Sequence, residues 1–301
     1  MAERFDLSEM SKEPFKVLDD GFVRVIDVLG DDAAIVQAAR VSYGKGTKKR
    51  SQDEELIRYL MRHRHTSPFE MCEIKLHVRC PMDCWRQWIR HRTASVNEYS
   101  TRYSVAIDSA AKTNPDEWRL QDTINIQGSK GMLDTETGKK LSKREAEVQK
   151  TCREAYEERL SLGVAREQAR KDLPLATYTE AYWKIDLHNL LHFLELRLAW
   201  NAQYEIREYA HTIGYSIVAK WVPITWQAFL DYHMNAITLS HTEADFLSLL
   251  ASGKTDATLD KMKRLGWLKL KGSDLIPNLE AREFGEKLEK LGIPVPWESS
   301  A

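Results

Sequence analysis

The chain has 301 residues, of which 43% are hydrophobic and 30% charged, the composition of a globular protein. No apolar run approaches the roughly 20 residues of a membrane helix, and the N-terminus lacks the apolar segment of a secretory signal, so we expect no membrane insertion and a cytoplasmic protein. Its 44 Lys and Arg nearly cancel 45 Asp and Glu, which excludes a globally basic nucleic-acid binder but allows a local anion site.

The first predicted elements are a strand and a helix. Residues 22–29 alternate in the manner of a strand that Gly30 closes. Asp31 or Asp32 is placed to cap the helix that follows through the sequence AAIVQAARVSY.

A second helix is predicted over residues 53–65, because leucine, isoleucine and methionine recur there at helical spacing. Ser51 and Glu54 form an S-x-x-E capping box before it. The helix should end before Thr66, since Pro68 disfavours a helical residue at position 67.

Residues 71–79 give the clearest strand pattern of the chain. Alternation puts one apolar set on a single face: Cys72, Ile74, Leu76 and Val78. Pro81 can then begin a helix through residues 82–92, with Trp85, Trp88 and Ile89 on its apolar side.

A polar, irregular stretch is predicted for residues 104–140, because Gly, Pro and charged residues interrupt every period there. Ser142 and Glu145 then form a capping box for a long helix that Gly163 ends. A short helix should follow before Pro174.

The region after Pro174 begins with a strand through residues 175–185, rich in β-branched and aromatic side chains. Asp186 is placed to cap an apolar helix over 187–200, and a further helix over 201–221 ends before Pro223.

The character of the chain changes after Tyr232, where short amphipathic segments alternate with Gly, Ser and Asp. We therefore expect an α/β (α+β) catalytic body over 1–232, with an antiparallel or mixed sheet flanked by helices. Residues 233–301 should form a small helical extension.

The four cysteines, Cys72, Cys80, Cys84 and Cys152, match no zinc or CxxC spacing, so we interpret them as free thiols. The pair His188 and His192 lacks a helical HExxH motif or a cysteine partner, so no metal site is predicted.

Cations concentrate in the stretch RHRTASVNEYSTRY, residues 90–103. Guanidinium forks beside serine and amide side chains suit an anion such as phosphate. A solvated cationic surface with ion pairs to Glu98 is the plainer interpretation of an RHR triplet alone.

The same stretch resembles the RHR-x7-S signature of the flavin-dependent thymidylate synthases (ThyX), matched by Arg90, His91, Arg92 and Ser100. Four other segments resemble blocks of that family in the right order: AARVSY at 38–43, HTSPFE at 65–70, AREQARKDLP at 165–174 and LHFLELR at 191–197. The resemblance covers roughly residues 15–232.

The resemblance implies reductive methylation of dUMP to dTMP, with methylenetetrahydrofolate as carbon donor, NADPH as reductant and FAD as hydride carrier. The family uses no cysteine nucleophile, and its members are homotetramers with active sites shared between subunits.

Site residues carried over from the resemblance fall into two sets. The dUMP set is Gln87, Arg90, Glu98, Ser100, Arg102, Arg170 and Arg197, with Arg197 beside the pyrimidine as the catalytic residue. The FAD set is His65, Ser67, Glu70, Arg90, His91, Arg92, Glu98, Asp186, His188 and His192. The sequence has no GxGxxG, so a Rossmann turn is not expected to bind the flavin. Family members often carry asparagine where His192 stands and histidine where Asn201 stands.

Two other functions fit parts of the pattern. One is a flavin oxidoreductase that binds a nucleotide without methyl transfer. The other is a nucleic-acid-binding module in which Trp85 and Trp88 stack on bases next to the cations, although the near-neutral total charge argues against it.

Overall fold

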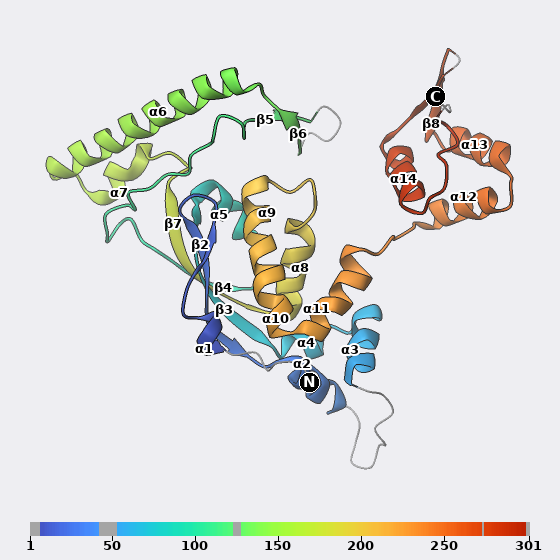
Figure 1. Cartoon of the computed structure of the whole chain (residues 1–301), viewed down its shortest axis with the longest axis horizontal. Helices are drawn as coiled ribbons and strands as arrows, with labels where there is room; N and C mark the ends of the chain where they lie inside the picture. The colour runs from blue at the N-terminus through green and yellow to red at the C-terminus, as the bar shows by residue number, and fades with distance from the viewer. Residues whose placement is uncertain (1–6, 42–52, 123–127, 273, 299–301) are drawn as a thin grey trace. The chain divides into compact units, whose positions relative to one another are not determined.

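A five-stranded antiparallel sheet organises the larger part of the described chain (Figure 1). The computed structural model describes residues 7–41, 53–122, 128–272 and 274–298. The strand order is β1-β2-β3-β7-β4, and neighbouring strands pair antiparallel. The predicted α/β fold is confirmed. The strands are β1 Phe15–Val17, β2 Gly21–Leu29, β3 Glu73–Pro81, β7 Tyr178–Asp186 and β4 Ser95–Glu98.

The chain divides into two compact units, Met1–Met234 and Asn235–Ala301. Among the described residues, no helix is long and apolar enough to cross a membrane.

One face of the sheet carries the hydrophobic core. The strand alternation predicted for residues 71–79 is confirmed, since its apolar set is fully buried while Glu73, Lys75, His77 and Arg79 are half-buried on the other face. β7 repeats the pattern, with Ala181, Trp183 and Ile185 buried. Two faces of different polarity follow directly from the two-residue period of the strands.

Trp88 is the centre of the core between the sheet and three helices, α5 (Met82–Trp88), α8 (Leu187–Arg197) and α9 (Tyr204–His211). Its ring lies 5.2 Å from Trp183 of β7, 5.1 Å from Phe193 of α8 and 5.6 Å from Tyr209 of α9, measured between centroids. These tilted and edge-to-face aromatic contacts hold α5, α8 and α9 against the sheet.

Helix α5 is shorter than the helix predicted over 82–92. The backbone N–H groups of Arg90 and His91 donate to the carbonyls of Gln87 and Trp88, three residues back, which closes a tight turn instead of continuing the helix. Ile89, expected on the apolar side, is 42% exposed. Arg90, His91 and Arg92 therefore lie in a loop.

The helices α2 (Asp32–Arg40), α3 (Asp53–Arg62) and α4 (Ser67–Glu70) belong to the same unit. Asp31 caps α2, as predicted, and its Oδ1 accepts from Ala34 N. Ser67 was expected outside a helix but begins α4, where Pro68 occupies the first turn, a position that tolerates its missing N–H. The capping box at Ser51 lies outside the described residues.

Asp32 connects two helices that are remote in sequence. Its carboxylate accepts from Ile224 N, Thr225 N and Thr225 Oγ1 at 2.9, 3.0 and 2.6 Å. It thereby satisfies free N–H groups in the first turn of α11 (Pro223–Phe229).

The stretch 104–140 contains more structure than predicted. Two short strands, β5 Arg119–Gln121 and β6 Ser129–Met132, pair with each other, and helix α6 (Thr135–Ser161) begins seven residues before Ser142. Asp134 caps α6, and the expected capping box at Ser142 and Glu145 is wrong. Both side chains instead bond the loop before β5.

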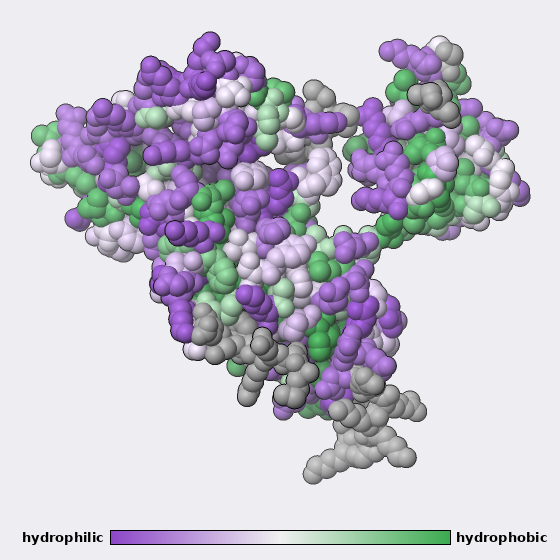
Figure 2. Space-filling model, in the orientation of Figure 1, coloured by the Kyte–Doolittle hydropathy of each residue, from purple (hydrophilic) through white to green (hydrophobic). Residues whose placement is uncertain are grey.

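A polar stripe on α6 holds that loop, residues 106–118. Ser142 Oγ donates to the Thr113 carbonyl, Glu145 accepts from Thr113 N, and Gln149 Nε2 donates to the Ala111 carbonyl. Arg153 donates to the carbonyls of residues 106 and 107. Figure 2 shows that this side of the unit is largely hydrophilic.

The remaining elements of the first unit are mostly helical. Helix α9 continues through a π-helical segment, η2 Thr212–Val218, into α10 (Ala219–Trp221). Trp226 closely approaches Gly214, where an added Cβ would lie 2.7 Å from the indole ring. The others are α1 Leu7–Met10, α7 Arg166–Ala169, η1 Arg170–Asp172 and η3 Leu230–Met234.

The second unit has its own core, in which Phe246, Trp267 and Phe284 are buried. The three helices fit the predicted short amphipathic segments, and a two-stranded hairpin was not foreseen. The elements are α12 His241–Ala251, α13 Thr255–Arg264, β8 Leu268–Lys271, β9 Asp274–Pro277 and α14 Leu279–Lys290.

Candidate active site

Arg197 is the last residue of α8 and contacts the loop that carries the RHR triplet. Its Nε donates to Nε2 of His91 over 3.1 Å. Asp186 places this helix as its N-cap, with Oδ1 accepting from Asn189 N and Oδ2 accepting from Asn189 Nδ2. The structure thus brings together two predicted site residues, Arg197 and His91, that are 106 positions apart.

His91 is uncharged at neutral pH. Burial, followed by electrostatic interactions with Arg197 and His192, lowers the pKa of His91 to about 4. Because Arg197 donates to Nε2, the remaining ring proton resides on Nδ1. The imidazole packs edge-on against Phe193, with centroids 4.9 Å apart. A neutral acceptor held by an aromatic ring therefore orients the guanidinium.

Arg197 itself is half-buried, and burial lowers its pKa from the ordinary arginine value. Among the described residues it has no carboxylate partner. A guanidinium removed from water without a counter-ion is costly, so the site favours an anionic or electron-rich ligand there.

Gln87 projects from α5 toward the start of α9. Its Nε2 donates to Gln203 Oε1, and Gln203 Nε2 donates to Asp83 Oδ2 over 3.3 Å. The predicted residue Gln87 is thus the end of a three-residue polar chain.

A second group of predicted residues gathers where β4 and the segment after it meet α7 and η1. Arg170 Nη1 donates to Thr101 Oγ1 at 2.5 Å, and Arg102 pairs with Glu167 at 3.3 Å. Ser100 Oγ accepts from the backbone N of Arg102. The cluster of Ser100, Arg102 and Arg170 thus brings a hydroxyl and two guanidinium groups close together.

Glu98 does not form the ion pairs that the plainer interpretation of the RHR triplet required. Its Oε1 accepts from Thr179 Oγ1 of β7 at 2.9 Å. Arg90 and Arg92 are exposed, and neither guanidinium has an ion-pair partner among the described residues. Both remain available for an anion.

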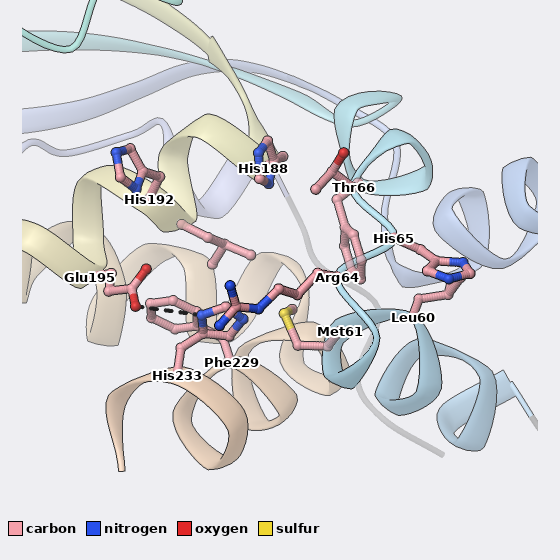
Figure 3. A pocket seen from close by; sticks show the side chains of 12 residues that line it. Leu60, Met61, Arg64, His65, Thr66, His188, His192, Glu195, Phe229 and His233 are labelled. Carbon is pink, nitrogen blue, oxygen red and sulfur yellow. Dashed lines mark ion pairs between the residues drawn. The ribbon is translucent and has the colours of Figure 1, made fainter. Parts of the chain in front are cut away.

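A cavity of about 220 Å³ lies between the α3–α4 turn, α8 and α11 (Figure 3). It brings together three predicted flavin residues, His65, His188 and His192. Apolar side chains form part of its wall: Leu60, Met61, Phe69, Leu191 and Phe229.

Arg64 extends into this cavity toward Glu195 and His233 (Figure 3). His233 Nδ1 lies 3.6 Å from Glu195 Oε1. Arg64 has a φ of 56°, in the left-handed region that is unusual for a residue with a side chain. Strained backbone of this kind is concentrated at functional sites.

Ser67 and Glu70 lie on α4. Ser67 and His65 line a neighbouring hollow next to α2 and α3, and Glu70 is exposed. Ser67 therefore lies beside the His65 end of the cavity, and neither of the two predicted residues lines it.

Several residues of the site escaped the sequence-based prediction: Asp83, Thr101, Thr179, Arg64, Glu195, Gln203 and His233. Most are polar residues without a local motif, and only the tertiary contacts reveal them. Gln203 is one of these, because the sequence predicts a helix from residue 201 and only the structure shows that Gln203 is the N-cap of α9.

Trp85 and Trp88 are 2% and 0% exposed, respectively. Buried indoles cannot stack on bases, so the tryptophan platform required by the nucleic-acid interpretation is wrong. Among the described residues, no group of three or more His, Cys, Asp or Glu is arranged to hold a metal ion.

Comparisons with known proteins define the family. The family model described as "Thymidylate synthase complementing protein" (Thy1) matches residues 24–224. The flavin-dependent thymidylate synthase of Wolbachia pipientis wMel is 51% identical over 242 residues, which cover 80% of this chain and 85% of that protein. The enzyme of the same name from Gluconobacter oxydans (strain 621H) is 54% identical over 230 residues, 75% of this chain and 76% of that protein.

A solved structure agrees with these sequence matches. The UMP/dUMP methylase PolB from Streptomyces cacaoi, bound with 5-Br UMP, superposes with a TM-score of 0.65 at 31% identity, covering 73% of this chain and 98% of that one. The α/β fold of this chain matches the fold of that methylase. The chain belongs to the Thy1 family, that of the flavin-dependent thymidylate synthases.

Proposed function

We infer that the protein is a flavin-dependent thymidylate synthase. It converts dUMP to dTMP, with methylenetetrahydrofolate as carbon donor, FAD as cofactor and NADPH as the reductant. Family membership over residues 24–224 supports this function.

The observation that carries the proposal is the half-buried Arg197, held by neutral His91 and without a described carboxylate partner. Methylation at C5 of uracil requires electron density at that carbon. A fixed cation beside the pyrimidine stabilises negative charge on the ring and so activates C5 without a covalent adduct. In this proposal, Arg197 supplies this field.

The cysteines support activation without a thiol. Burial raises the pKa of Cys72 to about 12, and a hydrogen bond with Cys80 together with burial raises the pKa of Cys84. The thiolate is the nucleophilic form of cysteine. Neither thiol supplies it at neutral pH, and Cys152 lies on α6.

We propose that Ser100, Arg102 and Arg170 bind the dUMP phosphate, with Arg90 joining them. Fork-shaped donors match phosphate oxygens two at a time. Gln87, Glu98 and Arg197 would contact the sugar and the base.

The residues that line the cavity also fit a flavin. The cavity combines apolar walls with the imidazoles of His65, His188 and His192, and such sites suit a flat ring with polar edges. Arg92 and Arg90 are cations available for a pyrophosphate, while Ser67, Glu70, His91, Glu98 and Asp186 are further proposed contacts. When bound, FAD carries the electrons that reduce the transferred one-carbon unit to a methyl group. His192 offers a ring nitrogen where relatives often have an asparagine amide, so both can hydrogen-bond a ring edge.

We further propose a cytoplasmic homotetramer with shared active sites, as the family resemblance implies. Residues 235–301 would be accessory, because the family match ends at residue 224 and this unit has its own core. A chain truncated after Met234 should still methylate dUMP, whereas loss of FAD binding on truncation would contradict an accessory role.

Tritium release from [5-³H]dUMP tests the proposed function. Purified protein should be yellow and should release tritium only when methylenetetrahydrofolate and NADPH are both present. NADPH oxidation that needs dUMP but no folate would favour a nucleotide-binding flavin oxidoreductase instead. Colourless protein that ignores dUMP would refute both functions.

A further inference from the structure

A chain of three polar side chains joins α5 to α9 behind the proposed nucleotide site. Asp83 Oδ1 accepts from the backbone N of Cys84 at 2.7 Å, and Oδ2 accepts from Gln203 Nε2 at 3.3 Å. Gln203 Oε1 in turn accepts from Gln87 Nε2. All three side chains are partly buried.

The direction of this chain is fixed at Asp83. An ionised carboxylate accepts hydrogen bonds and cannot donate them. Gln203 must therefore turn its NH₂ group toward Asp83, which leaves its carbonyl oxygen toward Gln87. Gln87 then turns its own NH₂ group toward Gln203, and its Oε1 faces the other way.

The placement of Gln203 agrees with a positioning role. It is the N-cap residue of α9, yet its side chain makes no capping hydrogen bond. N-cap side chains usually bond the first turn of their own helix. Here the side-chain amide of Gln203 bonds Asp83 and Gln87 of α5 instead, so it does not cap α9.

The carboxylate of Asp83 is also held by the backbone N–H of Cys84. Burial raises the pKa of Asp83, while the hydrogen bonds from Cys84 N and Gln203 act in the opposite direction. Arg197 lies near the C-terminal end of α5, because its Nε donates to His91, three residues after Trp88, where the helix ends. The polar chain and the proposed catalytic arginine thus share one neighbourhood.

We propose that Asp83 and Gln203 are positioning residues that orient the Gln87 amide, so that Gln87 Oε1 accepts a hydrogen bond from an N–H or O–H group of the nucleotide. The proposal rests on the proposed function, in which Gln87 contacts dUMP. Without the Asp83 carboxylate, the side-chain amides of Gln203 and Gln87 can both flip. Gln87 would then present an NH₂ group where the nucleotide needs an acceptor.

The first test is Asp83→Asn, measured by calorimetric titration of dUMP into the FAD-loaded protein. Asparagine keeps the size of the side chain and can both donate and accept, so a merely structural contact would survive. Positioning instead predicts that the Kd for dUMP rises about tenfold, as expected when a hydrogen bond to the ligand is lost. The melting temperature should stay close to that of the wild type.

The decisive test exchanges the carboxylate and the amide. Gln203→Glu alone places two carboxylates side by side and should weaken dUMP binding. In the double variant Asp83→Asn/Gln203→Glu, the introduced asparagine donates to the introduced glutamate, whose carboxylate again accepts from Gln87 Nε2. The double variant should therefore recover dUMP affinity to within about threefold of the wild type, since residues in one hydrogen-bond network are energetically coupled and each change compensates for the other.

Controls separate this proposal from the proposed function. Asp260→Asn, in an exposed pair with Lys263 of the second unit, should leave dUMP affinity unchanged. Gln203→Met, which cannot relay a hydrogen bond, should match Asp83→Asn and serves if that variant folds poorly. A wild type that does not bind dUMP refutes the proposed function. A wild type that binds it, with Asp83→Asn equally tight or with no recovery in the double variant, overturns the positioning role alone.

Discussion

The guanidinium of Arg197 and the imidazole of His91 meet over 3.1 Å, with the arginine donating and the histidine accepting. This contact fixes the Nε edge of Arg197 and leaves its two Nη groups for a ligand. Its direction also requires an uncharged His91, because a protonated imidazole has no acceptor nitrogen.

Replacing Arg197 tests its proposed role in catalysis. Arg197→Lys keeps a charge but loses the planar fork, and Arg197→Ala loses both. We expect kcat to fall about 100-fold or more in either variant, the range found when a preorganised charge-stabilising donor is removed. Arg207→Lys is a suitable control, because Arg207 donates to the Trp200 carbonyl in an exposed position. Near-normal kcat in Arg197→Lys would contradict the role of the fork.

Acidification should destabilise the protein through His91. In the unfolded chain this imidazole takes up a proton near pH 6.5, while in the folded protein its pKa is about 4. Between these values the unfolded chain binds more protons, so the free energy of unfolding falls as pH falls, by at most about 1.4 kcal/mol per pH unit for one group.

His91→Phe removes this dependence while keeping an aromatic ring against Phe193. Thermal unfolding between pH 6.5 and 4 should therefore show a shallower decline in the variant than in the wild type. Equal slopes would show that His91 is protonated in the folded state. An NMR titration of the His91 ring in Arg197→Ala should show its pKa moving upward, because a positive neighbour has been removed.

The four cysteines should be dispensable for turnover. A variant with Cys72, Cys80, Cys84 and Cys152 all replaced by alanine should still release tritium from dUMP. It should be less stable, by about 1 kcal/mol for each buried thiol removed. Complete loss of activity in a folded variant would mean that a thiol takes part in the chemistry.

Asp32 should matter for stability and not for chemistry. Asp32→Asn retains one accepting oxygen for three donors in α11, so we expect a loss of about 1–2 kcal/mol in unfolding free energy. Asp231→Asn, which removes a surface ion pair with Arg58, should cost less than about 1 kcal/mol. Chemical denaturation of both variants measures the difference, and equal costs would refute the capping role of Asp32.

The strands, the apolar helices and several caps could be predicted because their signals are local. Strand β3 shows a two-residue alternation, and α8 has an aspartate directly before an apolar run. The start of α6 could not be predicted in the same way. Ser142 and Glu145 have the spacing of a capping box, but tertiary hydrogen bonds to Thr113 engage both side chains. The same side-chain atoms could cap a helix locally or bond a distant loop, and in the structure they bond the loop.

The site was only partly predictable for a related reason. The RHR-x7-S motif lies in one continuous stretch, so Arg90, His91, Arg92 and Ser100 were visible together. Asp83 and Gln203 are 120 positions apart, and nothing in the sequence around either indicates that they meet. The loop position of residues 90–92 was not predicted either, since the sequence alone favours a longer helix and only the structure shows the tight turn that closes α5.

The polar stripe of α6 constrains the evolution of the loop it holds. The helix offers donors and acceptors at intervals of three or four residues, and successive carbonyl and amide groups of residues 106–118 use them in order. Inserting or deleting one residue in this loop would shift the backbone groups that follow it away from their hydrogen-bond partners on α6. Substitutions can accumulate on the outer side of α6, but the length of the loop should vary far less than that of an ordinary surface connection.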